Sequence, residues 1–187
     1  MTYYGGKNLA FSFRQVRTNT IQIAEEIPEA KYSFKGAPDT RSIGQLLAHI
    51  ALGPAIQMHI HGSKVNDLKA INFMELFQKS MAEEGKPRTK AETIALLKAE
   101  SDKVATFLEG LSDDFLAEPV TQPPGMQPTT KTRFEMLMSM KEHEMHHRGQ
   151  LMLLERMIGV VPHLTRQMQE RMAQRAAAAA GAGGQAR

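Results

Sequence analysis

The apolar residues of this 187-residue chain recur mostly at steps of three and four, the spacing that gathers side chains on one face of an α-helix. Four long segments show this pattern, and hardly any segment alternates as a half-buried strand does. We therefore predict an all-α fold, a four-helix bundle around one core. The predicted long helices cover about 9–27, 42–61, 90–110 and 132–158.

Three of the helix starts carry a capping box, in which a hydroxyl and the side chain three residues later satisfy opposite backbone donors. The boxes are "SIGQ" from Ser42, "TKAE" from Thr89 and "TRFE" from Thr132. Inside the second helix, the dipeptide Gly53-Pro54 removes a backbone donor, so we expect a kink or break after His49. One short extra helix is predicted between the second and third, capped by Asp67 and ended by "EEGKP".

Two further segments are predicted to contribute little regular structure to the bundle. Residues 118–130, "EPVTQPPGMQPTT", are rich in Pro, Gly and Thr, which favours a long irregular loop over one end of the bundle. Residues 163–187 form an Ala-rich, basic tail that we expect to be partly helical or disordered and to carry no chemistry. We therefore expect one bundle domain over 1–162 and a tail over 163–187.

Composition narrows the functional classes. The formal net charge of +3 does not come from a basic block, so nucleic acid is not an expected partner. The chain has no cysteine, so any bound metal must use His, Asp or Glu. We see neither a targeting segment at the start nor a stretch long enough to span a membrane, and we expect a cytoplasmic protein without membrane contact.

The candidate chemistry is concentrated in "KEHEMHHRGQ", residues 141–150. His143 and His147 lie one helical turn apart, on the face that also carries Met140 and Leu154, so both should point into the bundle. Two buried imidazoles without partners would be costly, whereas a pair at this spacing is a simple chelate for a divalent ion. The pattern therefore favours a metal site.

His49 is the best candidate for a third ligand, because its face of the second helix is otherwise apolar or small. His59 and His61 lie roughly 15 Å or more farther along a straight helix, so we interpret them as a polar helix end. We place His146 at an interface or beside the site, and His163 at the surface.

Three neighbours of the histidine pair could assist it. Gly149 costs a helix roughly 1 kcal/mol relative to Ala, which suggests close approach by another backbone or by a ligand. Gln150 returns to the histidine face and could hydrogen-bond a ligand there. Glu144 could support the site, although a solvated position on the helix surface is the preferred interpretation.

The same residues also satisfy the metalloprotease pattern H-E-x-x-H, with His143 and His147 as ligands and Glu144 as the base. The extended form of that motif is absent, because Gln150 stands where it requires glycine. A distal third ligand such as Glu170 would have to come from the tail. We regard a protease as the less favoured hypothesis.

The segments "TRSIGQLLAHI" and "HEMHHRGQL" resemble the DinB/YfiT-like family of metalloenzymes, from about Phe11 to Pro162. The resemblance implies a bundle in which His49, His143 and His147 hold one divalent ion per chain, variously nickel, zinc, iron or manganese. It also implies open positions on the ion for water or thiolate, transfer of low-molecular-weight thiols to electrophiles, and dimers.

Two hypotheses remain open. The first is a metal-dependent transferase or hydrolase that acts on a small molecule, with water or thiolate on the ion as the reactive group and Glu144 or Gln150 in support. The second is a non-catalytic protein that binds a metal or a small ligand. Thirteen methionines and many apolar helix faces add to the expectation of a homodimer.

Overall fold

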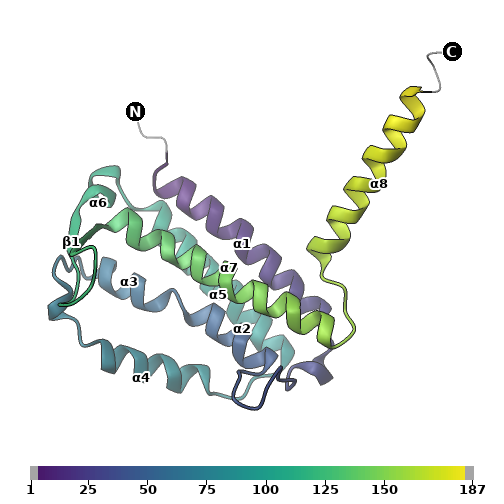
Figure 1. Ribbon diagram of the computed structural model, residues 1–187. Coiled ribbons are helices and arrows are strands. Elements are labelled where there is room, and N and C mark those ends of the chain that lie inside the picture. Colours follow the sequence, from purple (N-terminus) through teal and green to yellow (C-terminus); the bar gives the residue numbers. More distant parts are fainter. Residues whose placement is uncertain (1–3, 184–187) are drawn as a thin grey trace.

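The computed structural model describes residues 4–183 of the chain, with side chains through residue 179. The Gly-rich end of the predicted tail, 184–187, lies outside the described residues. Four helical columns lie side by side, formed by α1, by α2 with α3, by α5 and by α7 (Figure 1). The predicted all-α four-helix bundle is therefore confirmed. In chain order the elements are α1 (Gly6–Glu26), α2 (Ile43–Leu52), α3 (Ala55–Gly62), α4 (Phe73–Glu84), α5 (Lys90–Glu109), α6 (Asp113–Ala117), β1 (Pro119–Thr121), β2 (Thr130–Thr132), α7 (Arg133–Met157) and α8 (His163–Gly183), with 3-10 turns at Glu29–Lys31 and Leu68–Ala70.

All three predicted capping boxes form. Ser42, Thr89 and Thr132 each accept a hydrogen bond from the backbone N–H three residues later, and the side chain there accepts one in return. These caps satisfy backbone donors that a helix start otherwise leaves unpaired. Two of these caps, at Ser42 and Thr132, fix the start of α2 and α7, the two helices that carry the histidines and that pack against each other.

The expected break at Gly53-Pro54 is also confirmed. Helix α2 ends at Leu52, and α3 begins at Ala55 with Pro54 before its first residue. Proline has no N–H and clashes with the carbonyl one turn back, so the first helix cannot continue through it. His49 consequently lies in the last turn of α2.

The extra helix begins later than predicted. The side chain of Asp67 accepts from Lys69 N at 2.9 Å, which caps only the 3-10 turn Leu68–Ala70. Asn72 is the cap of α4, because its side chain accepts from Glu75 N at 3.2 Å. Both residue types cap helices well, and the chain uses each of them once.

The prediction that residues 118–130 contain no regular structure was wrong. Strands β1 and β2 pair at the two ends of this segment, with Pro119 opposite Thr132 in an antiparallel ladder. Proline is tolerated at the first position of a strand on an edge, where its missing donor costs no ladder bond. The buried side chain of Val120 holds the hairpin against a small cluster with Ile60 and Met136.

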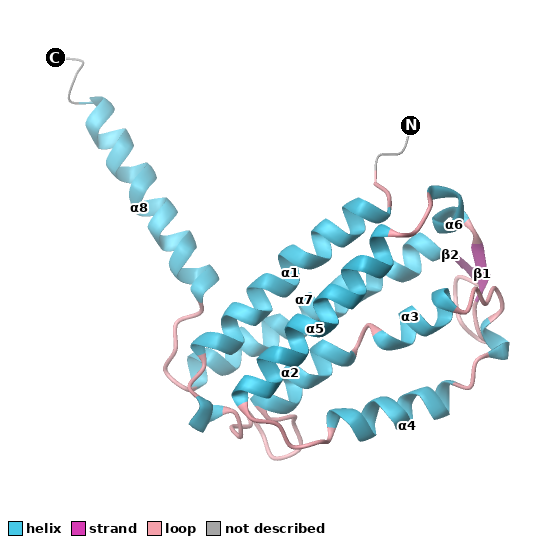
Figure 2. Ribbon diagram, turned by 180° about the vertical axis from the view of Figure 1, so that it is seen from behind, coloured by secondary structure: helices cyan, strands magenta, loops and turns pink. Residues whose placement is uncertain are grey.

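Helix α8 leaves the bundle and projects away from it (Figures 1 and 2). Its first residue, His163, is buried, so the predicted surface position was wrong. The His163 Nε2 atom lies 3.3 Å from the Asn19 side-chain oxygen, which ties the start of α8 to α1. Burial lowers the pKa of His163. Among the described residues, no helix is long and apolar enough to cross a membrane.

A buried glutamate next to this junction predicts a pH-dependent stability. Glu155 is fully buried and neither of its carboxylate oxygens has a hydrogen-bond partner among the described residues. Burial and the nearby carboxylate of Glu26 raise the pKa of Glu155 to about 7, from 4.5. Between pH 4.5 and about pH 7, Glu155 keeps in the folded state a proton that it has lost in the unfolded state. The stability of the fold therefore falls as the pH rises through this range.

The variant Glu155→Gln cannot ionise at this position. We therefore expect the unfolding free energy of the wild-type protein to fall by about 2 kcal/mol relative to that of Glu155→Gln when the pH rises from 5 to 8. Urea denaturation of both proteins at the two pH values measures this difference. Parallel stability curves for the two proteins would contradict a raised pKa at Glu155.

Candidate metal centre

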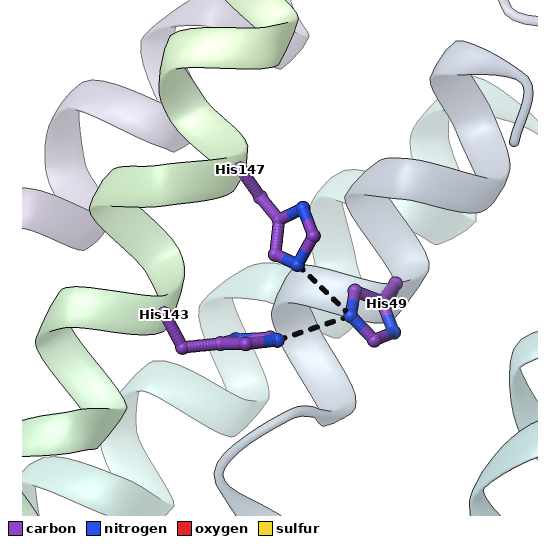
Figure 3. A group of neighbouring side chains, drawn as sticks. All are labelled: His49, His143 and His147. Carbon is purple, nitrogen blue, oxygen red and sulfur yellow. Dashed lines mark hydrogen bonds between the residues drawn. The ribbon is translucent and has the colours of Figure 1, made fainter. Parts of the chain in front are cut away.

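The structure brings His49, His143 and His147 together from two helices (Figure 3). The His49 Nε2 atom lies 3.0 Å from His143 Nε2 and 3.2 Å from His147 Nε2. One ring nitrogen from each residue lies within 4.8 Å of the others, and all three side chains are partly buried. The i, i+4 spacing on α7 places two rings on one face, and the last turn of α2 supplies the third.

The hydrogen bonds of the outer ring nitrogens fix where the protons lie. His49 Nδ1 is 2.8 Å from Glu84 Oε2, and His147 Nδ1 is 2.8 Å from Gln150 Oε1. Both partner oxygens are acceptors, so each Nδ1 carries the proton of its neutral ring. In neutral rings, the Nε2 atoms of His49 and His147 then carry no proton. Each presents a lone pair, and the two atoms face each other.

Such an arrangement fits a cation. Two acceptor lone pairs 3.2 Å apart repel one another, and His143 Nε2 has only one proton that it could place between them. A divalent ion would instead accept all three lone pairs. Nitrogen ligands lie about 2.0–2.1 Å from zinc in tetrahedral sites, which puts neighbouring ligand nitrogens roughly 3.3 Å apart. The observed spacings of 3.0 Å and 3.2 Å are close to this value.

The surroundings of two of the imidazoles favour their neutral form. Burial, with help from the neighbouring His147 and His49 rings, lowers the pKa of His143 to about 4. Burial also lowers the pKa of His147. Neutral imidazole is the form that binds metals, so these two rings need not lose a proton to do so at pH 7.

Glu84 and Arg41, which the sequence did not reveal, complete the surroundings of His49. Glu84 ends α4, accepts the His49 hydrogen bond and forms an ion pair with Arg41. Although burial raises its pKa, the hydrogen bonds from Arg41 and His49 outweigh burial and lower the pKa of Glu84. A histidine ligand commonly donates its second N–H to a carboxylate, which orients the ring and increases its basicity.

Gln150 lies where the prediction placed it, beside the histidines. Its oxygen accepts from His147 Nδ1, and its nitrogen lies 3.3 Å from His146 Nε2. His146 therefore orients the amide that orients His147. His59 is exposed on α3, as expected of a polar helix end, whereas His61 is buried, so that interpretation was wrong for His61. Burial, together with the adjacent Arg133, lowers the pKa of His61 to about 4.

Glu144 is not a solvated surface residue, so that prediction was wrong. Its carboxylate is 1% exposed, and both oxygens accept from Arg17 Nε, at 2.9 Å and 3.0 Å. Arg17 also donates to the carbonyl oxygens of Leu97 and Ile50, at 3.0 Å and 3.1 Å. One buried guanidinium thus joins α1 to α7, α5 and α2, next to the backbone that carries His49 and His143.

This pairing weighs against the protease hypothesis. A general base must reach the proton that it removes, and Glu144 instead faces α1 through its contacts with Arg17. The proposed distal ligand, Glu170, is exposed on the projecting α8. Within the part of the chain that the structure describes, the three histidines are the only group of metal-ligating side chains so gathered.

Gly53, rather than Gly149, is the glycine at which another group approaches closely. A Cβ atom on Gly53 would lie 2.7 Å from His143 Cε1 and 2.9 Å from His143 Nδ1. Nothing lies within 4 Å of a Cβ atom on Gly149, so the predicted close approach at that residue does not occur within the described chain. The missing side chain of Gly53 leaves room for the His143 ring.

Replacing Gly53 with alanine should therefore displace the His143 ring and lower metal affinity by roughly tenfold, as loss of an orienting contact does. The backbone of Gly53 is helical, at φ −50° and ψ −40°, so alanine should not strain it. Gly149→Ala is the matched control, expected to keep the affinity and to add up to about 1 kcal/mol of helix stability. Isothermal titration with zinc compares the three proteins. Wild-type affinity in Gly53→Ala would show that the ring does not need this space.

Two cavities meet at the histidines. One, of about 710 Å³, is lined by Arg41, Gln45, His147 and Gln150, with Leu153 at its side. The other, of about 780 Å³, lies between α3, α4 and α7 and includes His49, Gly53 and His143 in its wall. Both volumes are within the range of small-molecule sites. His147 thus lines one cavity, and His49 and His143 line the other.

Comparison with known proteins identifies relatives of this chain and of its fold. The chain is 27% identical to the uncharacterized protein YjoA of Bacillus subtilis over 149 residues, which are 79% of this chain and 86% of YjoA. The crystal structure of YjoA, a DinB-like protein, matches with a TM-score of 0.60 at 24% identity, over 81% of this chain and 92% of that one.

Two further solved structures share the fold. A DinB-like protein from Bacillus cereus has a TM-score of 0.65 at 17% identity, covering 86% of this chain and 97% of its own. YfiT from Bacillus subtilis, described as "a probable metal-dependent hydrolase with an unusual four-helix bundle topology", has a TM-score of 0.64 at 13% identity, over 86% and 91%. Residues 12–151 match the sequence profile of the DinB superfamily. This match covers most of the chain and includes all three histidines, so the protein belongs to the DinB superfamily.

Proposed function

We propose that this protein is a metal-dependent enzyme that acts on a small molecule, with His49, His143 and His147 as the ligands of one divalent transition-metal ion. The observation that carries the proposal is the convergence of three Nε2 atoms, with His49 Nε2 3.0 Å from that of His143 and 3.2 Å from that of His147. A divalent ion on three neutral ligands supplies Lewis acidity, which lowers the pKa of a water or thiol that it binds.

The residues of the chain have separate tasks in this proposal. Glu84 and Gln150 hold the protons of His49 and His147 on the outer ring nitrogens, so that the inner nitrogens stay available. Arg41 neutralises Glu84 from the other side. Gly53 leaves space for the ring of His143. The two cavities give a substrate access to the histidines from either side.

Two reactions suit such a site, hydrolysis and transfer of a low-molecular-weight thiol to an electrophile. Hydrolysis is the first to test, because YfiT is described as "a probable metal-dependent hydrolase". The non-catalytic alternative, a metal or small-ligand binding protein, would be favoured by a fourth protein ligand. Among the described residues the group contains three ligating side chains, which favours catalysis.

The test uses the full chain loaded with zinc, nickel, manganese or iron(II), with the metal-free protein as reference. Hydrolysis of a panel of small esters and amides, and conjugation of small thiols to chlorinated electrophiles, should occur only with metal and should vanish in His143→Ala. If the protein binds one ion tightly yet turns over none of these compounds with any metal, the non-catalytic alternative replaces the enzyme.

We further propose that the protein is a homodimer. Helix α7 exposes the large apolar side chains of Met145, Leu153 and Met157, and the exposed Gly149 lies among them without a neighbour. Burying apolar surface of this kind against a second copy would stabilise a pair. Light scattering at micromolar concentration should give twice the mass of one chain. The mass of a single chain would remove this proposal.

A further inference from the structure

The larger cavity beside the histidines has a mainly apolar wall, in which buried side chains such as Ile60 and Met136 stand opposite the exposed Phe77 and Met81. It is lined from three helices by apolar residues, among them Ile56, Ile60, Phe77, Met81, Met136 and Met140. His49 and His143 lie in the same wall. An occupant of this cavity would therefore contact apolar side chains along its length and the histidine site at one end.

Helix α4 contributes to this wall in an unusual way. None of its residues is buried, whereas Phe77 and Met81 remain 52% and 69% exposed while they line the cavity. The helix is fixed near its ends instead. Phe73 packs against the small apolar cluster of α3 and β1, and Glu84 bonds to His49 and Arg41. Large apolar side chains held in the open beside a cavity gain free energy when a ligand covers them.

The charged groups at the edge of the cavity do not call for a charged occupant. Glu84 is already paired with Arg41 and His49. Glu135 accepts a hydrogen bond from the backbone N–H of Thr132 at 2.7 Å as part of the α7 cap. Lys131 and Glu142 also line the cavity, and their opposite formal charges leave no excess of one sign. The cavity therefore offers mainly apolar contact.

From these observations we infer that the cavity between α3, α4 and α7 binds the apolar body of the substrate, with Phe77 and Met81 as specificity-determining residues. The substrate class is then a small molecule in which an aliphatic or aromatic group is joined to a polar head that reaches the histidines. The inference rests on the proposed function, because that function supplies the reacting end of the molecule.

The cavity itself can be tested without a metal. N-phenyl-1-naphthylamine, a neutral apolar fluorophore, should bind the metal-free full chain at one saturable site. The variant Phe77→Ala/Met81→Ala should weaken this binding at least tenfold. Both side chains are largely exposed, and the variant loses the ring contact of Phe77 with Phe73 but no buried side chain, so it should stay folded, which circular dichroism checks. The matched control is Met74→Ala, since Met74 is 67% exposed on the same helix but does not line the cavity. It should bind as the wild-type protein does.

The link between the cavity and the histidines is tested with hydroxamates, whose head group chelates divalent ions. On the zinc-loaded chain, hexanohydroxamate should bind at least tenfold more tightly than acetohydroxamate. Each methylene group that is fully buried can raise the affinity by up to about fourfold. In Phe77→Ala/Met81→Ala this gain should fall below threefold, with the acetohydroxamate affinity unchanged.

The possible outcomes distinguish a failure of this inference from a failure of the proposed function. Fluorophore binding that is absent, or equally strong in the double variant, overturns the apolar cavity. A chain-length gain that persists in the double variant, or disappears equally in Met74→Ala, overturns the assignment of Phe77 and Met81. Fluorophore binding that follows the prediction, with no hydroxamate of any length bound to the zinc-loaded chain, leaves the cavity standing and rejects the proposed metal site.

Discussion

Replacing His49 with alanine should lower the affinity of the protein for zinc or nickel by more than the roughly 10- to 100-fold that loss of a mere orienting partner costs. The variant removes one of three ligating nitrogens, and the Glu84 carboxylate that held the ring loses its partner on that side. The two remaining imidazoles on α7 form a weaker chelate. Chelator competition or isothermal titration measures the change.

The same measurement on two further variants separates the bundle site from the protease motif. Glu170→Ala should leave the affinity unchanged, because Glu170 is exposed on α8. Glu144→Gln should also retain the metal, since it lies against Arg17 rather than among the histidines. Wild-type metal affinity in His49→Ala, or loss of metal in Glu170→Ala, would overturn the assignment of His49.

Glu144→Ala should have the largest effect on stability. It would leave the fully buried Arg17 guanidinium without its carboxylate, and breaking a buried ion pair on one side costs about 3–5 kcal/mol. For a chain of this size the melting temperature should fall by on the order of 10 °C. Thermal unfolding of the metal-free protein, followed by circular dichroism, measures the shift.

A double variant distinguishes a lost ion pair from lost packing. Arg17→Met/Glu144→Leu fills the same space with apolar groups, so it should recover much of the stability that Glu144→Ala loses. Glu144→Gln, which keeps a hydrogen-bond acceptor for Arg17 Nε, should fall between the wild-type protein and Glu144→Ala. Loss of one weak surface contact would change the melting temperature by only about 2 °C. If Glu144→Ala shifts it by no more than this, Arg17 must find another anion.

The sequence predicted the helices and the three histidines because both depend on local spacing. The i, i+4 spacing places His143 and His147 on one face whatever the surroundings, and an apolar face directs His49 inward. Gly53-Pro54 ends a helix by its own covalent structure, so the break before α3 was also predictable.

The residues that the sequence did not identify act across large sequence distances. Glu84 is 35 positions from His49 and meets it only because α4 folds back over α2. Glu144 is 127 positions from Arg17, and no periodicity marks a charge as buried. Helix α7 packs against both α1 and α2, so two of its faces are covered, and Glu144 lies on the one that faces α1.

Gly53 and Gly149 show the same limit of prediction from sequence. A helical glycine suggests that something approaches closely, but the sequence does not say at which glycine. The His143 ring lies against Gly53, whereas Gly149 has open space around it. Which of the two is needed depends on the packing of α2 against α7, which only the folded chain defines.

The most direct test of the metal centre is an anomalous-difference map from crystals of the protein grown with zinc. The structure predicts one strong peak per chain, about 2.0–2.1 Å from the Nε2 atoms of His49, His143 and His147, with Glu84 and Gln150 still bonded to the outer ring nitrogens. A map with no peak between these three nitrogens, or with its peak at other residues, would contradict the site and with it the proposed function.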